Sequence, residues 1–473
     1  MKYRSGLSRR NVAIGSLELA IILFALVILI APQVPSRAAG TGDVPTYMGS
    51  NTRDGYYPNE TGINPGNASR LAIKWKLQAG GSIDVQPVIL NGIIYWGSWD
   101  GYEHATRASD GAEIWKTNIG KTISAGTCTP KNAGPAGTAT IVQMAVNGAT
   151  EVVFVPGGDT AFYALDAASG HILWKTSLGA SPNEMLWGGS AVYNGNVYTG
   201  ISSYGDCPLT PGHVFELSGT TGAILHQFNT TAHNCPGAGA WDAPTIDETA
   251  GTLFITTGTI ASCNPSEIYA YALLELRASD LALLGHWQIP KSQQTGDGDF
   301  GSTATLFTAT INGTLHQMIG TVDKNGIYYA FDRNDISAGP LWERVVGMIK
   351  NHDKSSRASS AWDGSTLYEG NTTTTINGQS CKGSVRAINP ANGAFLWEYC
   401  APGKVTAGLT VVPGLVIVGA YSDLVVLNAA TGKKLFLYHD PSALAEFWGT
   451  VTVSNGVVYV GNRDGALYAF VVV

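Results

Sequence analysis

From residue 41 to the C-terminus, short apolar stretches alternate with turns, and no amphipathic helical stretch of useful length interrupts them. A unit of four strands recurs, in which glycine-containing turns join the strands and the fourth strand carries an aromatic residue. Turns such as Asn-Gly are typical of β-hairpins, because glycine accepts the positive φ that they need. The clearest copies are residues 88–120, 152–179, 385–400 and 453–470. The pattern therefore predicts an all-β fold built from repeats.

The aromatic residue of the fourth strand recurs about every 40 to 60 residues, which is the spacing of propellers and solenoids. The eight positions are Trp75, Trp115, Trp174, Phe228, Trp287, Trp342, Trp397 and Phe436. They predict an eight-bladed β-propeller, with seven blades as the alternative.

The first and last repeats are incomplete, and each supplies what the other lacks. Residues 70–77 (RLAIKWKL) form a fourth strand without the three that should precede it, whereas residues 451–470 supply three strands without a fourth. Pairing of these two ends would close the ring and hide its sheet edges. We therefore expect residues 41–473 to form a single propeller domain, closed by pairing the N-terminal strand with the C-terminal strands.

The N-terminus carries the pattern of an export signal. Four basic residues within residues 2–10 precede an apolar run over residues 19–31, and small residues follow it. This arrangement predicts that residues 1–40 are either a signal peptide or an uncleaved N-terminal anchor, in which residues 11–31 would lie in the membrane. Both interpretations place the propeller outside the cytoplasm, as a secreted, periplasmic or cell-surface domain.

Charge and composition exclude two classes of protein, disordered chains and nucleic-acid-binding proteins. Only 13% of the 473 residues are charged, 44% are hydrophobic, and the formal net charge is −7. A disordered chain would need low hydrophobicity and high net charge. A nucleic-acid-binding protein would need a surplus of basic residues, which this sequence lacks.

The repeats resemble the pyrroloquinoline quinone (PQQ) repeat of quinoprotein alcohol dehydrogenases. Residues 162–179 (FYALDAASGHILWKTSLG) are the closest match, and residues 46–77 resemble the opening segment of the exported enzymes. The resemblance implies a PQQ-dependent dehydrogenase that oxidises an alcohol or a sugar hydroxyl. The absence of a CxxCH motif excludes an attached c-type haem, so electrons would pass to a separate acceptor.

The resemblance also assigns roles to individual residues. Lys324, in VDKNGIYYAFDR, takes the position that binds the reactive quinone carbonyl. Trp241, in GAGAWDAPTIDETAGTLFITTGT, takes the position of the indole that stacks beneath the cofactor. The loop TGDGDFGST resembles the one that carries the catalytic aspartate, with Asp299 preferred and Asp297 second.

Two departures from the family pattern concern calcium and cysteine. Asp206, in SSYGDCP, and Thr259 fall where the family places calcium ligands, but many members have asparagine at the second position. A threonine hydroxyl is a poorer calcium ligand than an amide oxygen. Many members also carry two adjacent cysteines above the cofactor, whereas here the corresponding loop holds only Cys128. The departures point to the polyvinyl-alcohol-dehydrogenase-like branch or to a propeller that no longer oxidises anything. In the first case the substrate would be a small or polymeric alcohol.

The cysteines are expected on one face of the ring. Two of them fall in loops between the second and third strands of their repeats, and two others follow the fourth strands of the same repeats. This arrangement predicts disulfides Cys207–Cys235 and Cys381–Cys400, in keeping with an oxidising compartment. The pairing of the other two cysteines, Cys128 and Cys263, stays open.

A second class of function remains open from the sequence. PQQ-type blades also build scaffolds without activity, so the repeat defines the fold better than the chemistry. The alternative is a non-catalytic extracytoplasmic propeller that binds a protein, a glycan or a cell-wall partner. A pocket that gathers the lysine, the indole and the carboxylates would favour the enzyme.

Overall fold

The structure covers the predicted propeller domain almost entirely. The computed structural model describes residues 42–124, 126, 128–261, 267–347, 357–442 and 444–473. The predicted export signal of residues 1–40 and Cys263 lie outside the described residues. Within the described ranges, no helix has the length and apolar character that a membrane crossing requires.

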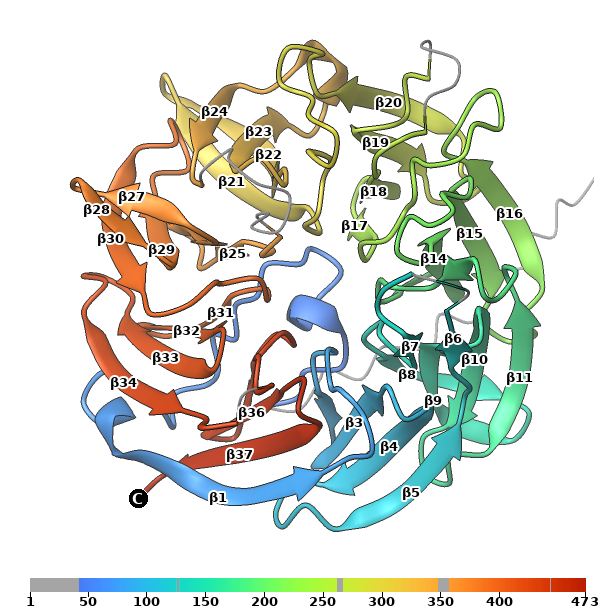
Figure 1. The fold of residues 1–473 in the computed structure, drawn as a ribbon, viewed down its shortest axis with the longest axis horizontal. Helices are drawn as coiled ribbons and strands as arrows, with labels where there is room; N and C mark the ends of the chain where they lie inside the picture. The colour runs from blue at the N-terminus through green and yellow to red at the C-terminus, as the bar shows by residue number, and fades with distance from the viewer. Residues whose placement is uncertain (1–41, 125, 127, 262–266, 348–356, 443) are drawn as a thin grey trace, which may run out of the picture. The chain divides into compact units, whose positions relative to one another are not determined.

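Eight antiparallel sheets of four main strands form the ring (Figure 1). Blade 1 consists of β2 (Val88–Leu90), β3 (Ile93–Ser98), β4 (Tyr102–Arg107) and β5 (Glu113–Asn118), and blade 2 of β8 (Thr140–Val146), β9 (Ala149–Pro156), β10 (Ala161–Asp166) and β11 (Ile172–Ser177). Blade 3 consists of β13 (Ala191–Tyr193), β14 (Asn196–Ser203), β15 (His213–Ser218) and β16 (Ile224–Asn229), with β12 (Glu184–Met185) beside β14. Blade 4 consists of β17 (Thr245–Asp247), β18 (Thr252–Thr256), β19 (Ala272–Arg277) and β20 (Leu283–Gln288).

Blades 5 to 8 continue in the same way. Blade 5 consists of β21 (Thr305–Ile311), β22 (Thr314–Val322), β23 (Ile327–Asp332) and β24 (Trp342–Val345), and blade 6 of β25 (Ala361–Trp362), β26 (Leu367–Asn371), β29 (Gly383–Ile388) and β30 (Phe395–Ala401). Blade 7 consists of β31 (Thr410–Val412), β32 (Leu415–Ala420), β33 (Asp423–Asn428) and β34 (Lys434–His439). Blade 8 consists of β35 (Thr452–Ser454), β36 (Val457–Gly461), β37 (Ala466–Val472) and β1 (Leu71–Gln78). Two hairpins and three short 3₁₀ helices complete the described chain, namely β6 (Thr122–Ile123) with β7 (Asn132–Ala133), β27 (Thr374–Ile376) with β28 (Gln379–Cys381), η1 (Tyr47–Gly49), η2 (Ala68–Arg70) and η3 (Ile336–Ala338).

The last blade confirms the predicted closure of the ring. Strand β1 pairs antiparallel with β37, with Leu71 opposite Val472 and Gln78 opposite Ala466. Every predicted fourth-strand aromatic lies on the outermost strand of a blade, so the count of eight is also confirmed.

The fourth-strand tryptophans join neighbouring blades. The Trp174 indole donates a hydrogen bond of 2.9 Å to the Gly219 carbonyl, in the turn between the third and fourth strands of the next blade. Four other tryptophans make the equivalent bond to the next blade, Trp75 to Ala108, Trp115 to Ala167, Trp342 to Pro390 and Trp397 to Ala429. A buried indole whose N–H is also satisfied links two neighbouring sheets by both packing and a hydrogen bond.

Residues 44–60, which we call the N-terminal segment, contact every blade in turn. Drawn in blue, this segment crosses the middle of the ring in Figure 1. Its bonds are, in blade order, Val44 with Ile89, Ile141 N–H to Pro45, the Asn51 side chain to Val192, Ile246 N–H to Asn51, Leu306 N–H to Thr52, Trp362 N–H to Asp54, Val411 N–H to Gly55, and the Asn455 and Gly456 N–H groups to Glu60. The segment therefore holds the inner ends of all eight blades at one face.

Arg53 anchors this segment. Its side chain is fully buried and donates to the backbone carbonyls of Pro244, Ser190, Tyr47 and Ser50 at 2.8 to 3.1 Å. Burial lowers the pKa of the guanidinium to about 10, so the group stays charged at neutral pH.

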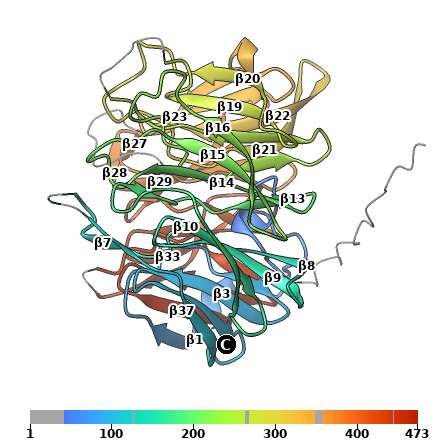
Figure 2. The same cartoon turned by 90° about the vertical axis from the view of Figure 1, so that its right-hand side faces the viewer.

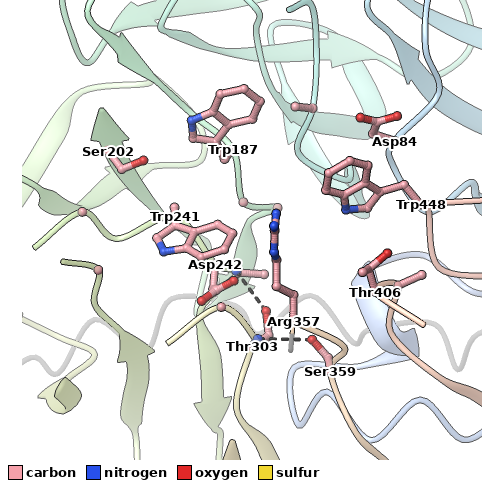
Figure 3. A pocket seen from close by; sticks show the side chains of 18 of the residues that line it. Asp84, Trp187, Ser202, Trp241, Asp242, Thr303, Arg357, Ser359, Thr406 and Trp448 are labelled. Carbon is pink, nitrogen blue, oxygen red and sulfur yellow. Dashed lines mark hydrogen bonds between the residues drawn. The ribbon is translucent and has the colours of Figure 1, made fainter. Parts of the chain in front are cut away.

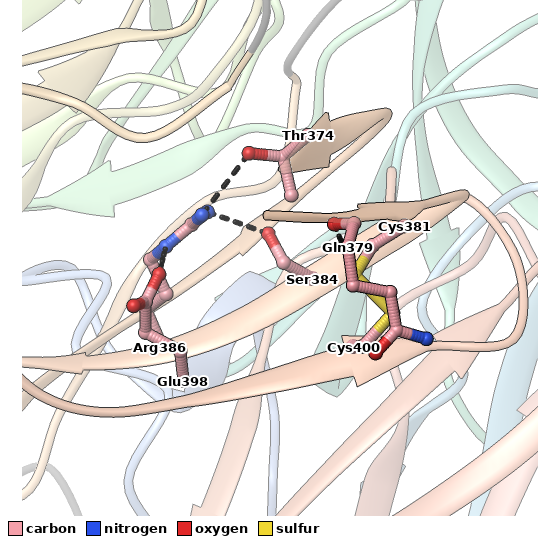
Figure 4. The surroundings of a disulfide bond; sticks show 7 residues. All are labelled: Thr374, Gln379, Cys381, Ser384, Arg386, Glu398 and Cys400. Carbon is pink, nitrogen blue, oxygen red and sulfur yellow. Dashed lines mark hydrogen bonds and ion pairs between the residues drawn. A yellow bond between two sulfur atoms is a disulfide. The ribbon is translucent and has the colours of Figure 1, made fainter. Parts of the chain in front are cut away.

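The disulfides confirm one predicted pair and correct the other. Cys381 and Cys400 are bonded, which ties the β27–β28 hairpin to β30 beside the Arg386–Glu398 ion pair (Figure 4). Cys207 is bonded to Cys128, so the predicted Cys207–Cys235 pair is wrong. Cys235 also forms a disulfide.

The β6–β7 hairpin explains the correction. It is inserted between blades 1 and 2 and brings the Cα of Cys128 to 5.8 Å from that of Cys207, in the β14–β15 loop of blade 3. In Figure 2, β7 and the β27–β28 hairpin project from the same side of the ring, while the blue N-terminal segment lies toward the other. The expectation that the cysteine loops share one face therefore holds for these two hairpins.

Candidate active site

A cavity of about 700 Å³ lies where the blades meet, and each blade contributes to its wall. Tyr47, from the N-terminal segment, lines it as well. All six residues that the sequence singled out for cofactor, metal or catalysis line this one cavity, Asp206, Trp241, Thr259, Asp297, Asp299 and Lys324. The structure thus brings together residues that are up to 118 positions apart, from Asp206 to Lys324.

Lys324 lies at the centre of the charged part of the cavity. It follows β22, in the tight turn that leads into β23. Its Nζ lies 2.7 Å from Oδ1 of Asp297 and 2.7 Å from Oδ1 of Asp299. The same ammonium lies 4.9 Å from the centroid of the Trp241 ring, which is a cation–π distance. One cation therefore touches both candidate carboxylates and the candidate stacking surface.

Asp299 is the more buried of the two carboxylates, with 3% of its side chain exposed against 34% for Asp297. Its Oδ2 accepts a hydrogen bond of 2.8 Å from the Thr259 N–H. Burial raises the pKa of Asp299, and Lys324 opposes this shift. Burial alone would lower the pKa of Lys324, but Asp299 and Asp297 raise it overall, so the lysine remains an ammonium.

Two further residues, Asn325 and Gly301, help to position Lys324 and the two aspartates. Asn325 donates 3.0 Å to the Gln293 carbonyl and accepts 2.7 Å from the Thr295 hydroxyl, which fixes the loop that carries both aspartates. Gly301 has no side chain, which leaves room for the side chains of the site beside it. A Cβ there would lie 3.0 Å from Arg357 Cγ and 3.3 Å from both Lys324 Cγ and Trp241 Cη2.

The donor set does not fit a calcium ion as the side chains are placed. Both Asp299 oxygens are engaged, by Lys324 and by the Thr259 N–H. The Thr259 hydroxyl lies 2.6 Å from the Tyr271 hydroxyl and donates 3.0 Å to the Gly296 carbonyl. No group of three His, Cys, Asp or Glu residues able to hold a metal occurs within the described ranges. Calcium is therefore given no role in the reaction.

Several lining residues escaped the sequence analysis. In Figure 3 the Arg357 side chain rises between the indoles of Trp241 and Trp448, and Trp187 lies above Trp241. Asp242 lies below them, and its Oδ2 accepts a hydrogen bond of 2.7 Å from the Thr256 hydroxyl. Asp242 directly follows Trp241, which was the only available signal for it. Nothing in the sequence around Arg357 distinguishes it from a surface arginine.

Asp242 should make stability depend on pH. Burial raises its pKa to about 7, from an ordinary value of 3.8, and the negative charge of Asp299 adds to the shift. The folded protein then keeps a proton that the unfolded chain releases, so the free energy of unfolding should fall as pH rises from about 4 to about 7. Each unit of pKa shift corresponds to about 1.4 kcal/mol.

This prediction is checked by urea unfolding at pH 4.5, 6.0 and 7.5. Asp242→Asn keeps a neutral group in place and should flatten the decline relative to the wild type. Asp110→Asn, at an exposed turn beside Arg107, serves as the control and should leave the decline unchanged. Equal slopes in the wild type and Asp242→Asn would show that Asp242 is ionised in the folded protein.

Comparison with known proteins agrees with the fold. The chain belongs to the PQQ_2 family of repeat propellers, whose model, described as outer membrane protein assembly factor BamB, matches residues 68–274 and 381–472. It is 23% identical over 471 residues to polyvinylalcohol dehydrogenase of Sphingopyxis sp. (strain 113P3), covering 87% of this chain and 69% of the relative. The predicted resemblance to quinoprotein alcohol dehydrogenases is thereby confirmed.

Solved structures support the same architecture. The crystal structure of quinohemoprotein alcohol dehydrogenase from Comamonas testosteroni is similar with a TM-score of 0.73 at 18% identity, covering 92% of this chain and 81% of that one. BamB from Moraxella catarrhalis gives a TM-score of 0.54 at 15% identity, covering 85% of this chain and 97% of that one. At these identities the likeness defines the fold alone, and the chemistry must come from the site.

Proposed function

We propose that the protein is an extracytoplasmic PQQ-dependent dehydrogenase that oxidises an alcohol or sugar hydroxyl in the central cavity. The observation that carries the proposal is the convergence of Lys324, Trp241 and Asp299 on one cavity of about 700 Å³. A flat, anionic quinone suits this cavity, because an indole offers it a stacking surface and Lys324 and Arg357 offer positive charge. The side chains of Arg357, Lys324 and Trp241 meet beside Gly301, which has no side chain to fill the space between them.

Three residues of the protein would each have a separate role in the proposed oxidation. When bound, PQQ would supply the acceptor for a hydride, that is, the hydrogen of the carbon that bears the hydroxyl group together with its two bonding electrons. Asp299 accepts the hydroxyl proton, since a buried carboxylate with a raised pKa is a stronger base than an exposed one. Lys324 supplies a positive charge that favours developing negative charge on a quinone oxygen. Trp241 supports and orients the ring.

Substrate and electron acceptor are proposed at the level of chemical class. Two of the similar proteins are polyvinylalcohol dehydrogenases, which favours a small or polymeric alcohol as substrate. No covalent haem motif is present in the sequence, so we propose a separate electron acceptor. The two described disulfides favour an oxidising, extracytoplasmic compartment.

Binding of PQQ tests the proposal directly. Purified apoprotein is titrated with PQQ, with and without calcium, while tryptophan fluorescence and alcohol-dependent dye reduction are recorded. We expect quenching and turnover in the wild type, and weaker binding in Trp241→Phe and Lys324→Ala. Trp362→Phe, outside the cavity on β25, is the matched control and should bind as the wild type does. Chelation with EDTA shows whether the predicted calcium is needed.

The same experiment addresses the scaffold alternative. The family description and the likeness to BamB favour, as the alternative, a non-catalytic propeller that binds a partner. Absence of both quenching and dye reduction over a range of alcohols would reject the enzyme and leave the scaffold.

A further inference from the structure

The charged centre of the candidate active site already holds a cation, the ammonium group of Lys324. We call Lys324, Asp297 and Asp299 the lysine–aspartate cluster. The Nζ atom lies 2.7 Å from Oδ1 of each aspartate, and only 11% of the lysine side chain is exposed. A calcium ion bound through either oxygen, at the usual distance of about 2.3–2.6 Å, would lie within about 5 Å of this ammonium. Two cations that close in a buried place repel each other, so calcium would have to displace the lysine.

Lys324 is held in the cluster by its main chain as well as by its side chain. Its backbone N–H donates a hydrogen bond of 2.8 Å to the Asp299 carbonyl, so the lysine binds the same aspartate twice. The ammonium also faces the Trp241 ring, at 4.9 Å from its centroid. The turn that carries Lys324 therefore fixes the ammonium between the two carboxylates.

The second oxygen of Asp299 is occupied by the backbone. Its Oδ2 accepts a hydrogen bond of 2.8 Å from the Thr259 N–H. Gly258 packs against the same oxygen, since a Cβ on this glycine would lie only 3.0 Å from it. Neither oxygen of Asp299 is thus available to a metal unless the chain around it rearranges.

Thr259 joins the two loops that meet here, a task that a shared metal ion performs in a metal site. It follows β18, whereas Gly296 and Asp299 lie in the loop between β20 and β21. The Thr259 hydroxyl donates 3.0 Å to the Gly296 carbonyl, so it accepts the bond of 2.6 Å from the Tyr271 hydroxyl. With the N–H bond to Asp299, three hydrogen bonds hold this threonine between the loops.

Asp206 is the other residue expected to bind calcium. It lines the same cavity but is exposed to solvent. Calcium takes about six to eight oxygen ligands, of which one carboxylate supplies at most two. Since Asp297 and Asp299 are bound to Lys324, Asp206 is the one predicted ligand that remains, and a single carboxylate does not make a calcium site.

We propose that the candidate active site binds its quinone without a divalent cation, because Lys324 and Thr259 perform the two tasks that a metal would have there. Lys324 supplies the positive charge beside the carboxylates and the quinone, and Thr259 joins the loops that carry the site. The proposal departs from the calcium that the family resemblance implies, and it rests on the proposed function of the cavity.

Calcium titration of the apoprotein is the first arm of the test. Wild type, Asp299→Asn and Lys324→Gln are treated with EDTA, dialysed and titrated with calcium in a calorimeter. We expect the same heats in the wild type and Asp299→Asn, because the wild-type carboxylate is not available to the ion. Lys324→Gln removes the ammonium and should bind calcium at about 10⁻⁴–10⁻³ M, as extracellular calcium modules do. Lys175→Gln, which removes an ammonium 2.8 Å from Asp159 on the outermost strand of a blade, is the matched control and should gain no site.

The second arm measures the affinity for PQQ by tryptophan fluorescence, first in EDTA and then in calcium. We expect the wild type to bind PQQ equally well in both buffers. Tighter binding in calcium would show that the ion is part of the site and would overturn the proposal. Failure of PQQ to bind in either buffer contradicts the proposed function, whereas the calorimetry on the apoprotein still stands, so the two failures are distinguishable.

Two calorimetric results would also reject the proposal. One is calcium binding by the wild type that Asp299→Asn abolishes. The other is a Lys324→Gln variant that is folded by circular dichroism and yet gains no site. If this variant does not fold, the comparison of the wild type with Asp299→Asn and the affinity for PQQ in EDTA decide the question.

Discussion

Asp299→Asn should lower the rate of alcohol-dependent dye reduction by about 10²- to 10⁴-fold at saturating PQQ, the range that a general base contributes. The amide keeps the size of the side chain and can still contact Lys324, but it cannot accept a proton. Binding of PQQ, followed by tryptophan quenching, should change by less than the rate. The measurement is steady-state dye reduction with the same alcohol in both proteins.

Asp297→Asn is the matched comparison, because Asp297 contacts the same lysine at the same 2.7 Å. It differs from Asp299 in exposure, since a third of its side chain faces solvent. We expect a smaller loss of rate than in Asp299→Asn. A larger loss would exchange the roles of the two carboxylates, and an unchanged rate in both variants would remove the proposed proton acceptor from the mechanism.

Arg53→Met should cost at least about 3 kcal/mol of unfolding free energy, because it leaves several buried carbonyl groups without their donor. The lost partners include the carbonyls of Pro244 and Ser190, which belong to segments far from Arg53 in sequence. Methionine fills much of the same volume, so the effect reports the hydrogen bonds rather than a cavity. Urea unfolding at constant pH measures it.

Arg70→Met is the control for this experiment. Arg70 is exposed at the end of η2 and donates one hydrogen bond, of 3.2 Å, to the Val473 carbonyl. Substitutions of this kind on the surface stay within about 0.5 kcal/mol. If both variants unfold at the same urea concentration, the N-terminal segment contributes little to the stability of the ring.

The architecture could be predicted because its signals are local. A fourth-strand tryptophan such as Trp174 and the glycine turns recur within each repeat, and the incomplete ends at residues 70–77 and 451–470 define the closure. The six candidate residues could be selected because short motifs that resemble those of the family surround them. Their meeting in one cavity then follows from the ring, which places equivalent loops at the same face.

The remaining features depend on distances that no repeat encodes. The Cys207–Cys235 prediction treated two blades as copies and did not consider the β6–β7 hairpin, which carries Cys128 across to blade 3. Arg357 follows no recognisable motif, and only the closed ring places it between two indoles. The burial that raises the pKa of Asp242 likewise arises from packing, because its sequence neighbours give no measure of solvent access.

The circuit of the N-terminal segment has a consequence for how the chain acquires its structure. Residues 44–60 are synthesised before every strand of the ring, yet Glu60 receives its partners Asn455 and Gly456 only when almost the whole polypeptide exists. Contacts separated by nearly 400 residues raise the contact order and delay folding. A nascent chain therefore lacks these contacts until synthesis is nearly complete, so the last blade can hold the N-terminal segment only after almost all of the chain has been made.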